Sequence, residues 1–141
     1  MIFLNNNRMY FPGISIAIPE NIFMETEPKV VGEYGIEFVS INPSFKIVIN
    51  YYDSDIEKNI KYYFGNFKIE VFKKFQVNGI VGFYAKYISR GLNYGEIILD
   101  IKNKNTFSLY IETKEDINMI FENENIKNLI NSIQLLNKNQ A

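Results

Sequence analysis

The chain has 141 residues, with 15 Lys and Arg against 16 Asp and Glu, and it contains neither cysteine nor histidine. This length favours a single domain, and the net charge of -1 lacks the basic excess that is typical of a general nucleic-acid binder. The absence of Cys and His excludes disulfides, thiolate and imidazole metal sites, and catalytic triads that use histidine.

Residues 1–10 are expected to form an irregular leader, followed by one domain over residues 11–137 and a frayed tail over residues 138–141. Uninterrupted apolar runs reach about six residues, as in Ile80–Ala85, far below the ~20 residues that a membrane-spanning helix needs. The first residues lack the features of a secretory signal, which predicts a cytoplasmic protein. A mature exported form from which the signal had been removed remains the alternative.

The first half of the chain predicts three strands in which apolar side chains alternate with other residues: 14–18, 36–41 and 45–51. Pro19 ends the first of these strands, because proline cannot donate a backbone hydrogen bond. Residues 21–35 contain one proline and two glycines, and we expect them to form a loop with some extended structure.

Two regions predict helices. Ser54-Asp55-Ile56-Glu57 fits a capping box, and apolar residues follow it at helical spacing as far as Gly65-Asn66, where the helix should stop. Near the end of the chain, residues 113–116 offer a second cap for a short helix. Residues 126–136 then predict a closing helix, because their apolar side chains recur at intervals of three and four.

The stretch Phe75–Thr113 predicts the antiparallel strands on which the rest of the chain packs. Asn78-Gly79 lies between alternating runs and is typical of a two-residue hairpin turn. A bulge or bend is expected near Phe72, a break at residues 91–95, and a turn at residues 103–105. If the register passes unchanged through these turns, the odd-numbered apolar residues share one buried face: Val81, Phe83, Leu99, Ile101, Leu109 and Ile111.

The order of these elements predicts an α+β fold, in which a largely antiparallel sheet of about six to seven strands is flanked by two or three helices. Three features taken in order resemble the PsbP-like superfamily: Ile14–Pro19 followed by Phe23, Val77–Gly82, and a closing helix that contains Asn131-Ser132-Ile133. That superfamily includes the photosystem extrinsic protein, a Ran-binding nuclear import factor, DcrB-type bacterial lipoproteins and some secretion chaperones.

The resemblance covers most of the chain and implies a sheet sandwiched between helices. It implies no catalytic residue, because members of the superfamily share none and bind different partners. The chain departs from the exported branch, since it has neither a signal nor a cysteine for lipid attachment.

Acidic residues cluster at three places: Asp53/Asp55/Glu57, Glu112/Glu115/Asp116 and Glu122/Glu124. Each cluster lies at an expected helix start or in a polar link, where negative charge is favourable against the helix dipole. The chain contains no phosphate-binding loop and no patterned serine nucleophile. We therefore expect no enzyme, and we assign no catalytic residue, cofactor or metal ligand.

Aromatic residues make up 16% of the chain, and tyrosine is enriched at binding surfaces. In the register above, one mixed face of the sheet combines aromatic and apolar side chains with charged ones, and five of its residues form the predicted binding surface: Tyr84, Arg90, Tyr110, Phe72 and Ile98. This surface favours a non-enzymatic protein-binding or adaptor domain of unknown partner. The alternative is a small carrier that holds an apolar or aromatic ligand between sheet and helix.

Overall fold

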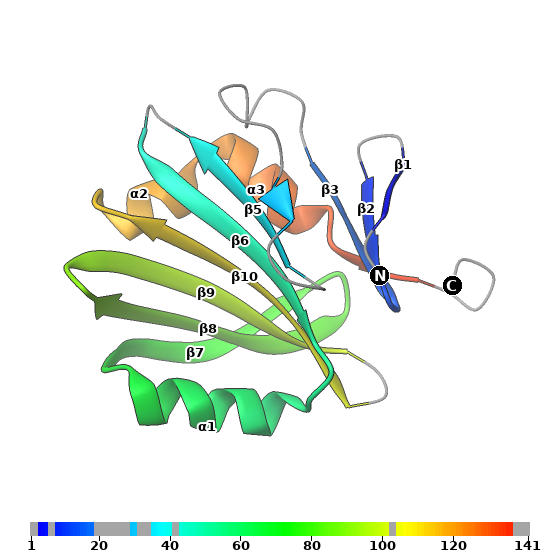
Figure 1. Ribbon diagram of the computed structural model, residues 1–141, viewed down its shortest axis with the longest axis horizontal. Coiled ribbons are helices and arrows are strands. Elements are labelled where there is room, and N and C mark those ends of the chain that lie inside the picture. The colour runs from blue at the N-terminus through cyan, green and yellow to red at the C-terminus, as the bar shows by residue number, and fades with distance from the viewer. Residues whose placement is uncertain are drawn as a thin grey trace.

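The computed structural model describes residues 3–5, 8–18, 29–30, 35–40, 43–101 and 104–136. In this part of the chain, a seven-stranded sheet and a four-stranded sheet, both antiparallel, combine with three helices (Figure 1). The predicted α+β fold with a large antiparallel sheet is therefore confirmed. The predicted tail over residues 138–141 lies outside the described residues.

The large sheet has the strand order β4-β5-β6-β10-β9-β8-β7. Helix α1 (Ile56–Asn66) joins β6 to β7, so it crosses beneath the strands that lie between them. Strand β7 forms one edge of the sheet, and its register contains a bulge between Ile69 and Val71, close to the position expected from the sequence. In spatial order the strands are β4 (Lys29–Val30), β5 (Gly35–Ser40), β6 (Phe45–Tyr52), β10 (Asn105–Thr113), β9 (Leu92–Ile101), β8 (Ile80–Ser89) and β7 (Ile69–Val77).

The small sheet joins the two ends of the chain. Its strand order is β1 (Phe3–Asn5), β2 (Arg8–Phe11), β3 (Ile14–Ala17) and β11 (Gln134–Leu135). The expectation of an irregular leader is therefore wrong, since Phe3–Asn5 and Arg8–Phe11 pair as strands and Met9 is buried in the core. The sequence did not reveal these strands, because each is only three or four residues long.

The ends of two helices differ from the sequence pattern: α1 begins one residue later than expected, and the closing helix begins and ends earlier. Asp55, not Ser54, caps α1, because its carboxylate accepts a hydrogen bond of 2.8 Å from the Lys58 backbone N–H. Helix α2 (Ile117–Glu122) is capped by Asp116, and helix α3 (Glu124–Asn131) follows it almost directly. The expected closing helix over residues 126–136 is therefore too long, since the chain leaves α3 to pair with β3.

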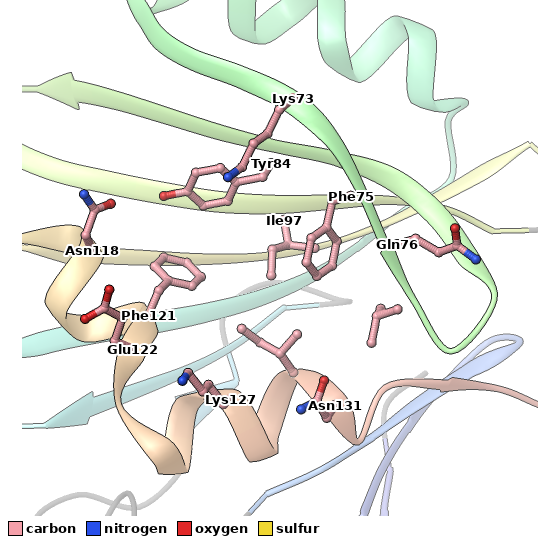
Figure 2. A pocket seen from close by; sticks show the side chains of 12 residues that line it. Lys73, Phe75, Gln76, Tyr84, Ile97, Asn118, Phe121, Glu122, Lys127 and Asn131 are labelled. Atoms are coloured by element: carbon pink, nitrogen blue, oxygen red, sulfur yellow. The ribbon is translucent and has the colours of Figure 1, made fainter.

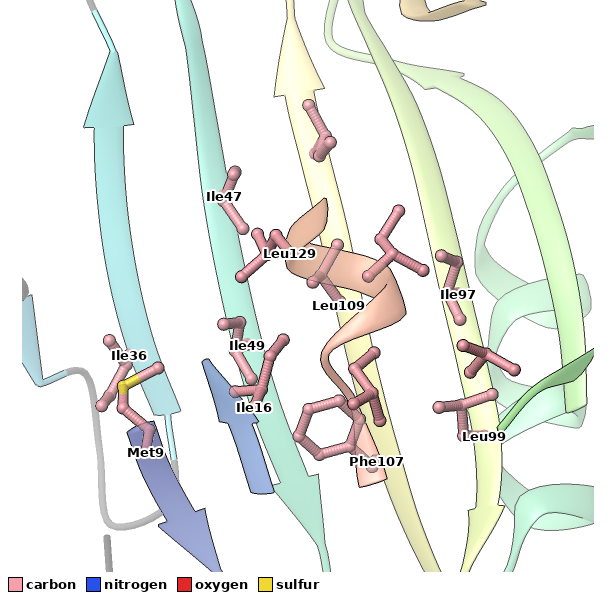
Figure 3. Close-up of a cluster of buried hydrophobic side chains, with 14 of the residues drawn as sticks. Met9, Ile16, Ile36, Ile47, Ile49, Ile97, Leu99, Phe107, Leu109 and Leu129 are labelled. Atoms are coloured by element: carbon pink, nitrogen blue, oxygen red, sulfur yellow. The ribbon is translucent and has the colours of Figure 1, made fainter. Parts of the chain in front are cut away.

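The face of the large sheet that carries Leu99 and Leu109, called the core face below, holds the main hydrophobic core (Figure 3). Leu99, Ile101, Leu109 and Ile111 are all buried there, as predicted. Helices α2 and α3 and the small sheet cover this face, with Leu129 of α3 packed among the strand residues. Helix α1 covers the opposite face, called the α1 face below, so the sheet lies between helices.

Val81 and Phe83 do not share the core face, and this part of the prediction is wrong. Residues directly opposite each other in an antiparallel pair lie on one face, and Leu99 is opposite Gly82 while Phe83 is opposite Ile98. The cause is the two-residue turn Arg90-Gly91, where both residues have positive φ, 54° and 75°. Across a two-residue turn, odd-numbered residues of one strand lie opposite even-numbered residues of the next. The odd-numbered residues of β8 therefore share a face with the even-numbered residues of β9.

Candidate functional site

An open groove of about 440 Å³ lies on the core face, between the β7–β8 hairpin and helices α2 and α3 (Figure 2). Aromatic and aliphatic side chains from strands and helices converge on it: Phe75, Val77, Tyr84, Ile97, Phe121 and Ile130. Polar side chains stand around them: Lys73, Gln76, Asn118, Glu122, Lys127 and Asn131. The groove therefore joins an apolar interior to a polar rim.

Gly95 on β9 allows α2 to rest directly on the sheet beside this groove. A Cβ atom at Gly95 would lie 2.4 Å from the ring of Phe121 and 3.1 Å from the hydroxyl of Tyr84. Because glycine leaves this space free, the two rings meet edge to face, with centroids 5.4 Å apart. Tyr84 and Phe121 thus form one rigid wall of the groove.

The rim carries two lysines that form no salt bridge among the described residues. Lys73 lies opposite Tyr84 in the β7–β8 register, and its Nζ is 5.5 Å from the centre of the tyrosine ring. Lys127 stands on α3, on the other side of the groove. Among the described residues, the salt bridges that form join Lys46 to Glu37 and Glu112, so neither groove lysine is paired with a carboxylate.

The α1 face contains a different cluster, built around the fully buried carboxyl group of Glu96. The hydroxyl of Tyr63 on α1 donates a hydrogen bond to Oε2, and the hydroxyl of Tyr87 on β8 donates to Oε1 at 2.8 Å. Burial raises the pKa of Glu96 to about 6, although the two tyrosine hydrogen bonds act in the opposite direction. Burial and the nearby carboxylate also raise the pKa of both tyrosines.

This cluster fastens α1 to the sheet, and its carboxyl group is closed off from solvent. Tyr63 is the one buried side chain of α1, and both Glu96 oxygens are already occupied by tyrosine hydroxyls. The buried Ser108 hydroxyl has no hydrogen-bond partner of ordinary geometry, yet it lies close enough to lower the pKa of Glu96. A carboxyl group with a shifted pKa can mark an active site, but the Glu96 carboxyl is fully buried.

The five predicted binding residues do not form one surface. Phe72, Ile98 and Tyr110 lie on the α1 face, where Phe72 stacks on Phe83 with centroids 4.8 Å apart and Ile98 is buried. Arg90 is exposed in the β8–β9 turn. Tyr84 lies on the core face and lines the groove, so the expectation that Tyr84 and Tyr110 share a face is wrong.

Several residues that matter here were not predicted from the sequence. Glu96 stands alone in the apolar run Tyr94–Leu99, and an isolated carboxyl in such a run is a signal that could have marked it. Phe121 and Lys127 line the groove from the helices, and their part in it depends on how α2 and α3 cross the sheet. No local pattern predicts such a crossing.

A second open groove, of about 460 Å³, has a lining that includes Val81, Phe83 and the start of α1 at Ile56. Its charged residues are one cation and one anion, Lys74 and Asp100, so it has no net charge. Within the described ranges, no helix is long and apolar enough to cross a membrane. The same residues contain no group of three or more carboxylates placed to hold a metal ion.

No protein-family model and no curated protein matches this chain. A solved structure from Bacteroides thetaiotaomicron VPI-5482 is similar to it, with a TM-score of 0.58 and 11% sequence identity. The match covers 98% of this chain and 49% of the other, so this chain spans about half the length of that one. A likeness at this identity shows a common fold, and the resemblance to the PsbP-like superfamily stays a prediction.

Proposed function

We propose that this chain is a non-enzymatic protein-binding domain, and that the groove between the β7–β8 hairpin and helices α2 and α3 is its binding site. The observation behind the proposal is the wall formed by Tyr84 and Phe121, where an aromatic interior meets a polar rim. Aromatic anchors that fill partly desolvated pockets dominate the energy of many protein interfaces. The groove would receive apolar or aromatic side chains of the partner.

We assign no catalytic role to any residue. Among the described acidic residues, Glu96 is the one whose pKa is clearly raised. It is buried on the far side of the sheet from the groove, where two tyrosines donate hydrogen bonds to it. The groove itself offers lysines, amides and one carboxylate, Glu122, at its rim. A general acid or base needs a reacting proton within hydrogen-bond reach, and Glu96 is fully buried with both carboxyl oxygens bonded to tyrosine hydroxyls.

The volume of the groove favours a second candidate, a small carrier of an apolar or aromatic ligand. About 440 Å³ falls within the range of roughly 300–1,000 Å³ that small-molecule sites occupy. The groove lies between sheet and helices, as that alternative requires. Mass spectrometry of compounds released from the denatured purified protein separates the two, since a carrier would release a stoichiometric small molecule and a protein-binding domain would not.

The binding site can be tested by filling the groove. Asn131 lies on its rim, whereas Asn128 is exposed on the same helix and does not line it. Amide resonances of Tyr84, Ile97 and Phe121 are expected to shift when N-acetyl-phenylalaninamide or N-acetyl-tyrosinamide is added. The substitution Asn131→Trp should abolish these shifts, and the matched control Asn128→Trp should leave them unchanged.

Either of two results would contradict the proposal. Shifts confined to the α1 face, around Tyr110, would move the site to the opposite side of the sheet. Shifts near Tyr84 that persist in the Asn131→Trp variant would mean that the groove is not what binds the probe.

A further inference from the structure

The outer edge of β7 offers unpaired backbone groups beside the groove. The large sheet ends at β7, which pairs with β8 alone, and the pairing is regular from Val71 to Val77. Among the described residues, no other element forms a hydrogen bond with the backbone of this segment. A row of free N–H and C=O groups on an edge strand can accept another strand.

The groove is continuous with this edge. Lys73, Phe75 and Val77 alternate along β7, lie on the core face opposite Tyr84, Gly82 and Ile80, and line the groove. Successive side chains of a strand point to opposite faces of its sheet. A segment added alongside β7 would therefore direct every second side chain over the core face, at the mouth of the groove (Figure 2).

The charges around this edge favour an acidic segment. Lys73 and Lys127 line the groove against a single carboxylate, Glu122, and neither lysine has a salt-bridge partner in the described chain. Lys74 is exposed next to Lys73 on the same strand. Edge lysines also prevent unwanted strand pairing, which accounts for Lys73 and Lys74. That role does not account for Lys127, because it stands on α3 across the groove.

We propose that the partner presents an extended segment in which every second residue is apolar and acidic in turn, and that this segment joins β7 as an additional antiparallel or parallel strand. Its apolar side chains enter the groove beside Tyr84 and Phe121. Its carboxylates also occupy every second position, so they lie on the same face and meet Lys73 and Lys127, where charge complementarity selects the partner. The inference rests on the proposed function, because it names the chemistry of the partner at the same groove.

The test uses a synthetic eight-residue peptide at micromolar concentration, called the acidic alternating peptide, with Thr at its odd-numbered positions and Phe and Glu in turn at its even-numbered ones. Three comparison peptides replace every Glu with Lys, exchange every Glu with the Thr before it so that the carboxylates and the Phe side chains point to opposite faces, or carry N-methyl groups on alternate residues. The acidic alternating peptide should bind, with protection from hydrogen exchange gained at the amides of residues 71–77. The other three peptides should bind at least about tenfold more weakly, and high salt should weaken the binding of the first.

A pair of charge-reversal variants tests the lysines. Replacing Lys73 and Lys127 together with Glu should weaken binding of the acidic peptide by at least about tenfold. The matched control replaces Lys58 and Lys61 of α1, which are exposed and distant from the groove lining, with Glu. This control changes the net charge equally and should leave the affinity unchanged. Thermal unfolding of both variants verifies that they remain folded.

Two outcomes would overturn the inference while the proposed function stands. In the first, the aromatic amides occupy the groove but the acidic alternating peptide does not bind. In the second, the N-methylated or the basic peptide binds equally well, so that neither β7 pairing nor charge selects the partner. Failure of both the aromatic amides and the peptide to reach the groove would instead overturn the proposed function itself.

Discussion

The two faces of the large sheet are covered by different means. The core face is apolar along β6, β10 and β9, and α2, α3 and the small sheet bury it by close packing. The α1 face carries tyrosines and the buried Glu96, and α1 is fastened to it by hydrogen bonds from Tyr63 and Asn59 and by stacked rings. The core face should therefore respond to changes in side-chain volume, whereas the α1 face should respond to the loss of a hydroxyl or to protonation.

The largest effect is expected on the core face. Leu109 is fully buried there, and the substitution Leu109→Ala should lower the free energy of unfolding by about 2–5 kcal/mol, because the lost contacts leave a cavity. Chemical denaturation measures this difference. Val81 is 55% exposed on the other face, so Val81→Ala is a matched control that should cost less than about 0.5 kcal/mol. Equal costs at the two positions would contradict the assignment of the faces.

The α1 face is tested by removing a single hydroxyl. Tyr63→Phe preserves the ring and takes one donor away from the buried Glu96 carboxyl, which should cost about 1–3 kcal/mol of stability. Tyr62, the preceding residue on α1, is 59% exposed, and Tyr62→Phe should change stability by less than about 0.5 kcal/mol. If Tyr63→Phe were as mild as its control, hydrogen bonding to Glu96 would not be what holds α1.

Protonation of Glu96 should change stability by about 2 kcal/mol. Its pKa is about 6 in the folded protein against 4.5 for an ordinary glutamate, so the folded state binds this proton more tightly than the unfolded state does. The contribution of Glu96 to the free energy of unfolding should therefore be largest below about pH 4.5 and fall as the pH rises through about 6. The core face has no such group among the buried residues that form its hydrophobic cluster.

The substitution Glu96→Gln isolates this effect, because glutamine stays neutral and can still accept a hydrogen bond from a tyrosine hydroxyl. The difference in unfolding free energy between the wild type and Glu96→Gln, measured between pH 4 and pH 7.5, should decrease by about 2 kcal/mol as the pH rises. A difference that did not change with pH would mean that Glu96 keeps an ordinary pKa in the folded protein.

Much of the fold could be predicted from local patterns. Asn78-Gly79 marked its hairpin, and both residues have positive φ, 50° and 78°. The alternation at Phe107, Leu109 and Ile111 correctly predicted that these side chains lie on the core face. Three residues connect β9 to β10, so odd-numbered residues of the two strands lie opposite one another, as the prediction assumed. These features depend on residues close together in the sequence.

The candidate site could not be predicted in the same way. It depends on which face of the sheet the odd-numbered residues of β8 occupy, and on packing between elements that are distant in the sequence. The Arg90-Gly91 turn was not recognised, since arginine seldom adopts positive φ, and the faces of β8 were exchanged as a result. Tyr84 was therefore grouped with Tyr110 instead of with Phe121 of α2. Strand β11 has only two residues and pairs with β3, more than 100 positions earlier in the chain.

The smallest expected effect concerns the turn that decides which side chains of β8 lie on which face. Arg90 has φ of 54°, a left-handed conformation that is unfavourable for most residues but tolerated by asparagine. The substitution Arg90→Asn would give this turn the Asn-Gly sequence of the β7–β8 hairpin, and it should raise the free energy of unfolding by about 0.5–1 kcal/mol.

Thermal or chemical denaturation checks this prediction. The control is Lys86→Asn, which also replaces a basic residue with asparagine but lies within strand β8, where the backbone is extended and asparagine is unfavourable. Arg90→Asn should stabilise the protein, and the control should not. The result bears on the whole comparison, because the two-residue Arg90-Gly91 turn pairs Tyr84 with Ile97 and Phe83 with Ile98, which places Tyr84 in the groove and Phe83 on the α1 face. A destabilising Arg90→Asn substitution would indicate a different turn, and the two faces of β8 would then have to be reassigned.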